Sequence, residues 1–112
     1  MALDIKLNKT DDVTIFDLIG NLDTNTAPLT ELKINESLDD GCKKMIINLE
    51  ETRFVSSAGL RVFLITAKKI TANSGALKLC NPNEVVQEIL TISGFDTIIP
   101  VKNSIEEGMN DF

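Results

Sequence analysis

Two adjacent serines, Ser56 and Ser57, are the side chains of this sequence best placed to take part in chemistry. They follow the apolar run Met45–Leu49 and precede a helical pattern that continues to about Ala72, so they fall at the start of a helix. The free backbone N–H groups and the dipole of a helix start favour negative charge. A serine hydroxyl there can cap the helix, which contributes about 1 kcal/mol, or it can receive a phosphate. On the residues alone, capping is the simpler interpretation.

The chain lacks the residues that most catalytic and metal sites need. It has no His, and its two cysteines, Cys42 and Cys80, are not in Cys-x-x-Cys spacing. Zinc sites and His-dependent nucleophilic catalysis are therefore excluded, and neither a metal nor a cofactor is expected. The cysteines are expected to behave as small buried hydrophobic residues in a reducing compartment. No Gly-x-Gly-x-x-Gly or Walker A loop follows a strand, so a small α/β enzyme or nucleotide-binding protein is the weaker alternative.

The charge balance and hydropathy of the chain exclude further classes of function. The 112 residues carry 11 Lys and Arg against 17 Asp and Glu, a formal net charge of −6. Nucleic acids and anionic membranes bind clustered cations, so neither partner is expected. No apolar run reaches the length of a membrane span, and residues 1–6 lack the layout of a signal peptide. A cytoplasmic location is therefore expected.

The spacing of apolar and turn residues predicts strands that alternate with helices in a single domain, residues 1–112. In chain order the expected elements are strands at 3–7 and 13–19, a helix at 27–38, a strand at 45–49, a helix at 57–72, a strand at 76–80, a helix at 84–92, a strand at 97–101 and a short helix that Ser104 and Glu107 begin with the spacing of a capping box. The polar turn Thr10–Asp12 implies an antiparallel hairpin, and the later alternation implies parallel pairing through right-handed crossovers. The expected fold is α/β, with a mixed, mostly parallel sheet of about five strands and helices packed against it.

The apolar periodicity of the helices predicts which faces they bury. The helix at 57–72 is expected to pack on the sheet through Leu60, Phe63, Leu64, Ala67 and Thr71. In the helix at 27–38, Leu32 and Leu38 are expected to share a face from which Ile34 points away. The helix at 84–92 is expected to turn Val85, Val86, Ile89 and Leu90 inward. Pro100 places the last strand near an edge of the sheet.

A second apolar strip on the helix at 57–72 has two interpretations. It consists of Ala58, Val62 and Ile65, on a face rotated away from the expected core face. The strip can be additional core, since a helix on a sheet can bury a wide stripe, or it can be an exposed surface for a protein partner. The second interpretation is preferred because the charged residues Arg61, Lys68 and Lys69 flank the strip.

The loop Gly20–Ala27 and the segment Phe54–Val62, set in this order of elements, resemble the STAS domain. More closely, the chain resembles the stand-alone anti-sigma factor antagonists, and the resemblance covers essentially its whole length. It implies a protein-binding module that is not an enzyme. The unphosphorylated protein is expected to bind an anti-sigma factor that is itself a serine kinase, which frees a sigma factor. Phosphorylation of one serine abolishes that binding, and a PP2C-type phosphatase restores it.

The resemblance also assigns roles to individual residues. The family's acceptor lies two residues before the Gly-Leu pair, which makes Ser57 the expected phosphorylation site. Many relatives have Asp immediately before the acceptor; this chain has Ser56 there, so Ser56 is a rival acceptor as well as the expected cap. Gly59 is expected to let the helix start lie close to the sheet.

Asp23 matches an acidic residue of the family's first loop. It either contacts the partner or orders its own loop by accepting backbone hydrogen bonds. The expected partner surface comprises Asp23, Thr24, Asn25, Ser56, Ser57, Ala58, Arg61, Val62 and Ile65. The alternative within the same domain type is a STAS subunit of a larger signalling or lipid-transport assembly.

Overall fold

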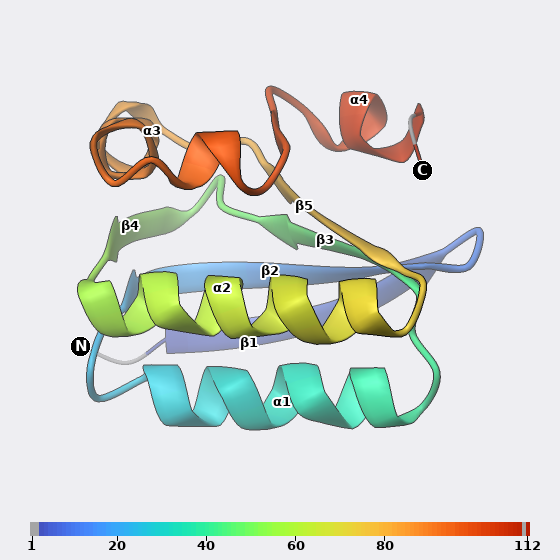
Figure 1. Cartoon of the computed structure of the whole chain (residues 1–112). Coiled ribbons are helices and arrows are strands. Elements are labelled where there is room, and N and C mark those ends of the chain that lie inside the picture. Colours follow the sequence, from blue (N-terminus) through green and yellow to red (C-terminus); the bar gives the residue numbers. More distant parts are fainter. Residues whose placement is uncertain (1–2, 111) are drawn as a thin grey trace.

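The computed structural model describes residues 3–110 and 112 of the chain. Within these residues it contains a six-stranded mixed sheet, four α-helices and one 3-10 turn (Figure 1). The elements are β1 Leu3–Thr10, β2 Val13–Leu22, α1 Ala27–Asp39, β3 Lys44–Asn48, β4 Thr52–Val55, α2 Ser57–Ala72, β5 Ala76–Cys80, α3 Glu84–Ile92, the turn Phe95–Thr97, β6 Val101–Lys102 and α4 Ile105–Asn110. The α/β class and the mixed, mostly parallel sheet are confirmed.

The sheet begins with the predicted antiparallel hairpin. β1 and β2 pair along their whole common length, and the turn between them consists of Asp11 and Asp12, with φ of 51° and 67°. Two successive residues with positive φ define the type I′ turn, whose twist matches that of the strands it joins. Both strands are longer than the sequence predicted, and β2 continues to Leu22 rather than ending at Ile19.

β4 is the strand that the sequence analysis missed. The sheet order is β1-β2-β3-β5-β6, and β4 pairs in parallel with the last residues of β2. The register shifts between Gly20 and Asn21, so that β2 pairs first with β3 and then with β4. Only Thr52 and Val55 of β4 are buried, and a strand of four residues shows too little alternation to be detected.

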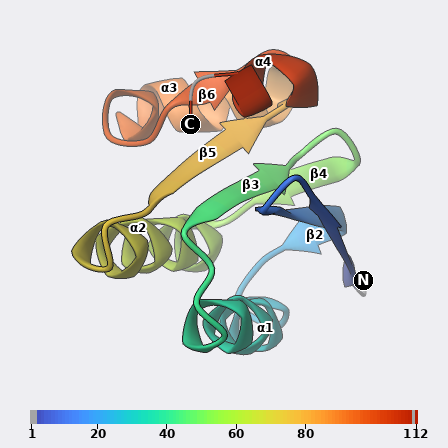
Figure 2. The same ribbon diagram turned by 90° about the vertical axis from the view of Figure 1, so that its right-hand side faces the viewer.

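The helices lie on both sides of the sheet. α1 and α2 run side by side on one side, and α3 and α4 lie on the other (Figures 1 and 2). The larger core is one continuous cluster of buried side chains that includes Phe16, Ile47 and Phe63. It contains residues of the sheet, of α1 and α2 on one side, and of α3 on the other. A smaller core lies under α4 and is built on Ile46 and Cys80.

Two helices bury faces other than those predicted. In α1, Leu38 is buried, but Ile34 is also fully buried and Leu32 is 55% exposed, so Leu38 shares its buried face with Ile34 and not with Leu32. The buried residues of α2 are Gly59, Val62, Phe63, Thr66 and Ile70. Of the expected core positions only Phe63 is fully enclosed, and Thr71 is exposed. The physical reason is that α2 packs against α1 as well as against the sheet, which rotates its buried face.

The last third of the chain departs from the prediction in two places. Val86 and Leu90 of α3 are buried as expected, but Val85 is 55% exposed. The expected strand at 97–101 is replaced by the turn Phe95–Thr97 and a two-residue strand, β6, which lies at an edge of the sheet as Pro100 predicted.

The C-terminal helix α4 begins as its sequence predicted. Ser104 Oγ accepts a hydrogen bond from the backbone N–H of Glu107 at 3.1 Å, and Glu107 Oε1 accepts one from the N–H of Asn103 at 3.4 Å. The first bond is the serine half of a capping box, whereas the second goes to the N–H of Asn103 and not to that of Ser104, so the box is only half formed. The exposed carboxylates of Glu106 and Glu107 lie in its first turn. Asp111, the third acidic residue near this end, lies outside the described residues.

Candidate functional site

Ser56 caps helix α2. Its backbone is extended, with φ −82° and ψ 176°, and its hydroxyl oxygen accepts a hydrogen bond from the N–H of Gly59 at 3.4 Å. Its own N–H donates to the carbonyl of Leu22 at 2.9 Å. Ser56 is half-buried. The capping interpretation therefore holds for this serine, and its hydroxyl is engaged with the protein.

Ser57 is the first residue of α2, and its side chain is exposed. Among the described residues, nothing forms a hydrogen bond with its hydroxyl. The hydroxyl thus differs from that of its neighbour in both exposure and engagement. It is accessible to a modifying enzyme, and it lies where the helix dipole favours an added negative charge.

Gly59 allows the start of α2 to lie directly against the sheet. A Cβ at this position would lie 2.7 Å from Cγ of Leu22, 2.9 Å from the Leu22 carbonyl oxygen and 2.9 Å from Cγ1 of Val55. Distances below 3.0 Å are not tolerated, and one of these atoms belongs to the backbone. The expectation of close packing is confirmed, and this packing fixes the position of the two serines relative to the ends of β2 and β4.

The loop between β2 and α1 is ordered by Asp23. Its Oδ1 accepts hydrogen bonds from the N–H groups of Asn25 at 2.9 Å and Thr26 at 3.1 Å. In return, Thr26 Oγ1 accepts one from the Asp23 N–H at 2.9 Å and lies 2.8 Å from the carbonyl oxygen of Asn21. Thr24 and Asn25 are exposed. Asp23 therefore has the loop-ordering role, and it presents the two exposed residues at a fixed place.

The structure brings this loop and the start of α2 together. Leu22 at the end of β2 pairs with Val55 at the end of β4, and the Ser56 N–H closes the next bond to Leu22. Asp23 and Ser57 each follow directly after these hydrogen-bonded residues. Asp23 and Ser57 are 34 residues apart in the chain (57 − 23), and the pairing of β2 with β4 places their two segments side by side.

One residue of the predicted partner surface is misplaced. Val62 is 2% exposed and belongs to the larger core, so it is not available to a partner. Ala58 and Ile65 are half-buried, and Ala58 packs against the same core. Of the predicted apolar strip, Val62 therefore belongs to the interior, whereas Ala58 and Ile65 keep part of their surface in contact with solvent. Arg61 is exposed as predicted.

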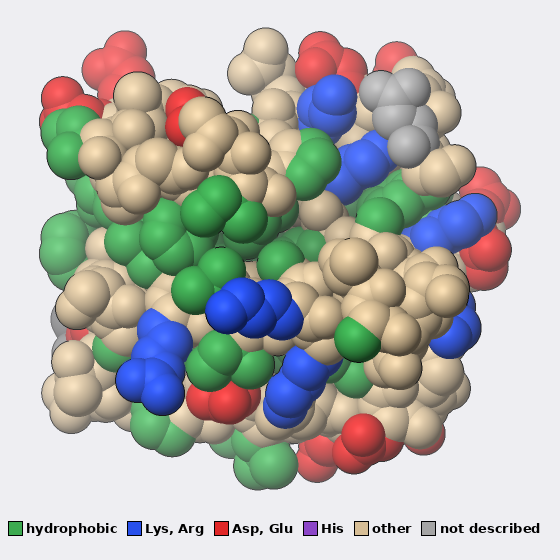
Figure 3. Space-filling view, viewed as in Figure 1, with side chains coloured by type: hydrophobic (Ala, Val, Ile, Leu, Met, Phe, Trp, Pro, Cys, Tyr) green, Lys and Arg blue, Asp and Glu red, His purple; other side chains and the backbone are tan. Residues whose placement is uncertain are grey.

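Basic side chains gather on this side of the molecule although the chain is acidic overall. Figure 3 shows Lys and Arg side chains over α2 and its boundary with α1. The exposed cations of α2 are Arg61, Lys68 and Lys69. Lys69 Nζ donates a hydrogen bond to Asn35 Oδ1 of α1 at 3.1 Å, whereas no described residue bonds the Arg61 guanidinium.

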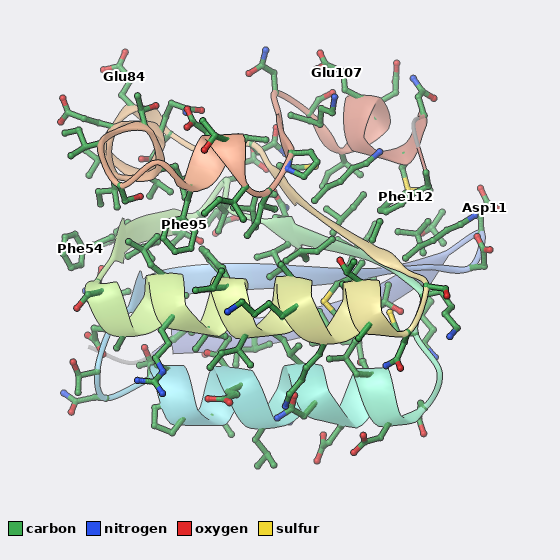
Figure 4. All side chains as sticks on the ribbon, in the orientation of Figure 1. Asp11, Phe54, Glu84, Phe95, Glu107 and Phe112 are labelled. Atoms are coloured by element: carbon green, nitrogen blue, oxygen red, sulfur yellow. The ribbon has the colours of Figure 1, made fainter. Side chains whose placement is uncertain are left out.

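Phe54 is a surface residue beside the site. It begins the segment Phe54–Val62, but its sequence position predicted no role for it. It is 47% exposed and projects from β4 near the start of α2 (Figure 4). An exposed phenyl group next to the two serines could contribute apolar area to an interface. The signal was its alternation with the buried Val55, which could be interpreted only once β4 was known to be a strand.

Two further observations concern metal ions and membranes. Among them, no group of three or more His, Cys, Asp or Glu side chains could hold a metal ion. No helix in the described part of the chain is long and apolar enough to cross a membrane.

Comparison with known proteins identifies the family. The family model of the STAS domain matches residues 4–108, and the chain therefore belongs to the STAS domain family. BtrV of Bordetella bronchiseptica, described as a candidate anti-sigma factor antagonist, is 35% identical over 102 residues, which cover 91% of this chain and 88% of BtrV. The resemblance drawn from the two sequence motifs is confirmed.

Solved structures agree with this assignment. A candidate anti-sigma factor antagonist from Thermotoga maritima is 26% identical and matches with a TM-score of 0.92, covering 96% of this chain and 92% of that one. The anti-sigma factor antagonist SpoIIAA in its unphosphorylated form is 24% identical and gives a TM-score of 0.82, over 96% of this chain and 94% of SpoIIAA. The phosphorylated form of SpoIIAA, from Bacillus, is 23% identical and gives a TM-score of 0.74, over 96% of this chain and 97% of that one. The likeness to SpoIIAA shows the shared fold.

Proposed function

We propose that this protein is a phosphorylation-controlled anti-sigma factor antagonist. In its unphosphorylated form it binds an anti-sigma factor that is also a serine kinase, and so releases a sigma factor in the cytoplasm. The observation that carries the proposal is the exposed, unengaged hydroxyl of Ser57 at the first turn of α2, beside the Asp23 loop. The protein acts by binding and has no catalytic role of its own.

Ser57 is the better phosphate acceptor of the two serines. Transfer to Ser56 would require its hydroxyl to leave the N–H of Gly59, which would cost the cap. Transfer to Ser57 breaks no bond among the described residues. The added phosphate carries about −1.5 to −2 charges at neutral pH and lies where the helix dipole stabilises it. The existence of a phosphorylated form of SpoIIAA supports the expectation that this fold can carry a phosphate.

The phosphate is expected to act on the interface rather than on the fold. The proposed docking surface consists of Asp23, Thr24, Asn25, Ser56, Ser57, Ala58, Arg61 and Ile65. A dianion at its centre must be desolvated or repelled when the partner binds. An unpaired buried charge costs several kcal/mol, which corresponds to a loss of affinity of about a thousandfold. No large conformational change is needed.

A kinase assay tests the proposal. The protein is incubated with ATP and candidate anti-sigma factors of the serine-kinase type, and the phosphate is mapped by mass spectrometry. We expect one phosphate on Ser57, none on the Ser57→Ala variant, and normal modification of the matched control Ser56→Ala. A PP2C-type phosphatase with its metal ion should remove the phosphate. The Ser57→Asp variant should bind the partner at least a hundredfold more weakly than the unmodified protein. Undiminished binding by Ser57→Asp, or normal phosphorylation of Ser57→Ala, overturns the mechanism.

A further inference from the structure

Arg61 is an unengaged cation one helical turn from the proposed phosphate acceptor. It lies four residues after Ser57 on α2, and both side chains are exposed. Lys69 on the same helix bonds Asn35, and Lys44 forms an ion pair with Asp12 at 3.4 Å. Within the described residues, Arg61 has neither a hydrogen bond nor an ion pair. Its guanidinium is therefore available to an anion.

We infer that Arg61 is the counter-ion of the phosphate on Ser57. Phosphorylation then changes the docking surface twice, because it adds a dianion and also withdraws the cation that an acidic partner surface would contact. The inference rests on the proposed function, since it assumes that Ser57 is the residue modified. It goes further by assigning a regulatory role to a residue that is not itself modified.

The helix geometry favours this pairing. Residues at i and i+4 lie on the same face, with about 5–6 Å between their Cβ atoms. The Cα–Cβ bonds of a helix tilt toward its N-terminus, a direction that lets a long side chain at position 61 reach back toward Ser57. An anion placed N-terminal to a cation at this spacing is the more favourable order. A planar guanidinium can donate two parallel hydrogen bonds to phosphate oxygens.

Other charged groups around the start of α2 are less suited to the role. Asp23 in the preceding loop is an anion and would repel the phosphate. Arg53 on β4 lines a groove together with Asp4, Glu50 and Glu51, which already supply negative charge around it. Glu31 on α1 is also an anion.

The remaining cations of α2 lie too far along the helix. Lys68 follows Ser57 by 11 residues, which is about 16 Å at 1.5 Å per residue. This separation exceeds the screening length of about 8–10 Å in physiological salt. Lys68 is therefore a suitable control, because its removal changes the net charge equally without touching the pair.

The test uses full-length protein with phosphoserine incorporated at position 57 during translation, so it does not depend on any kinase. The second pKa of the phosphate, near 6 in the absence of interactions, is measured by 31P NMR titration. A paired guanidinium stabilises the dianion and lowers this pKa. We expect Arg61→Gln to raise it by about half a unit, and Lys68→Gln to change it by less than about 0.1 unit. The Arg61 Nε–H signal should shift on phosphorylation in the parent protein.

The outcomes separate this inference from the proposed function. Equal phosphate pKa values in the parent, Arg61→Gln and Lys68→Gln proteins would overturn the pairing, even if kinase and partner assays succeed. Failure of the kinase assay at Ser57 would instead overturn the proposed function and the regulatory role of the pair, whatever the titration shows. Where both succeed, unphosphorylated Arg61→Gln should bind the partner about tenfold more weakly, and Lys68→Gln should bind within about twofold of the parent.

Discussion

At the scale of single residues, two neighbouring serines have different physical roles because the chain crosses from extended to helical backbone between them. The hydroxyl of Ser56 is held by the N–H of Gly59, and that of Ser57 points away from any described partner. The resemblance to the family predicted this division, because it made Ser57 the expected acceptor and Ser56 the expected cap. The sequence could not predict that Val62 is buried, because that depends on the contact between α2 and α1.

The division predicts unequal effects of two alanine substitutions on the free energy of unfolding. Ser56→Ala removes the cap and should lower the free energy of unfolding by about 1 kcal/mol. Ser57→Ala removes an unengaged hydroxyl and should change it by less than about 0.5 kcal/mol. Urea unfolding followed by circular dichroism measures both. A larger loss for Ser57→Ala than for Ser56→Ala would show that the roles are reversed.

Gly59 should be intolerant of even the smallest side chain. The Cβ of Gly59→Ala would overlap the Leu22 carbonyl oxygen and Cγ1 of Val55, so the start of α2 must shift away from the sheet. Overpacking of this kind costs about 1–3 kcal/mol, although alanine is the better helix former. The same unfolding measurement checks this, with Ser57→Ala as the control for a change at the helix surface. Unchanged or increased stability would contradict the close packing.

At the scale of elements, the sequence predicted the bounds of a helix better than its buried face. α2 runs from Ser57 to Ala72 as expected, because a cap and a C-terminal polar turn mark its ends. Its orientation depends on a neighbour that periodicity does not reveal. β4 escaped prediction because it has four residues and merges with the helix motif. The predicted site residues follow directly after β2 and β4, so the strand that escaped prediction is one of the two that position them.

The short helix α4 covers the second face of the sheet through an unusually close contact. A Cβ on Gly108 would lie 2.6 Å from Sγ of Cys80, and the carbonyl of Gly108 accepts a hydrogen bond from the buried Lys78 Nζ at 2.8 Å. The ammonium of Lys78 also lies 4.2 Å from the ring centroid of Phe112. These contacts hold the C-terminal segment against β5 and enclose the Cys80 thiol.

Substitution of Gly108 should therefore loosen α4 and expose this thiol. Gly108→Ala is expected to destabilise the protein by about 1–3 kcal/mol and to increase the reaction rate of Cys80 with a thiol reagent at least tenfold. Labelling is followed by mass spectrometry, with the half-buried Cys42 as the internal reference. The double variant Gly108→Ala/Cys80→Ala should recover part of the lost stability because the sulfur is gone. Purely additive effects of the two substitutions would contradict a direct contact.

At the scale of the whole molecule, charge is distributed unevenly over an acidic chain. The net charge of −6 argues against a nucleic-acid partner, yet Lys and Arg side chains gather over α2 and its boundary with α1 (Figure 3). The net charge follows from the composition, but the gathering of cations over α2 could not be predicted, because it depends on how α2 packs beside α1. Within the proposed docking surface, the exposed cation Arg61 would favour an acidic partner.

The pH dependence of the unfolding free energy should reveal the enclosed thiol. Burial raises the pKa of Cys80 from 9.0 to about 11, since desolvation disfavours the thiolate; Glu107 adds to this rise, while Lys78 and Lys102 oppose it. The unfolded chain releases the thiol proton near pH 9, whereas the folded protein keeps it until about pH 11. Between these values the folded state binds more protons, so stability falls as pH rises.

The stability that the protonated Cys80 thiol contributes to the folded state is thus fully present below pH 9 and is lost by about pH 11. One proton limits the slope to about 1.4 kcal/mol per pH unit. The cavity left by Cys80→Ala lowers stability by an amount that does not depend on pH, so the variant should differ from the parent by a constant below pH 9 and by less above it. Urea unfolding of both proteins from pH 7 to 10.5 measures the difference. Curves that stay parallel throughout would mean that the thiol is open to water in the folded protein, and that α4 does not cover it.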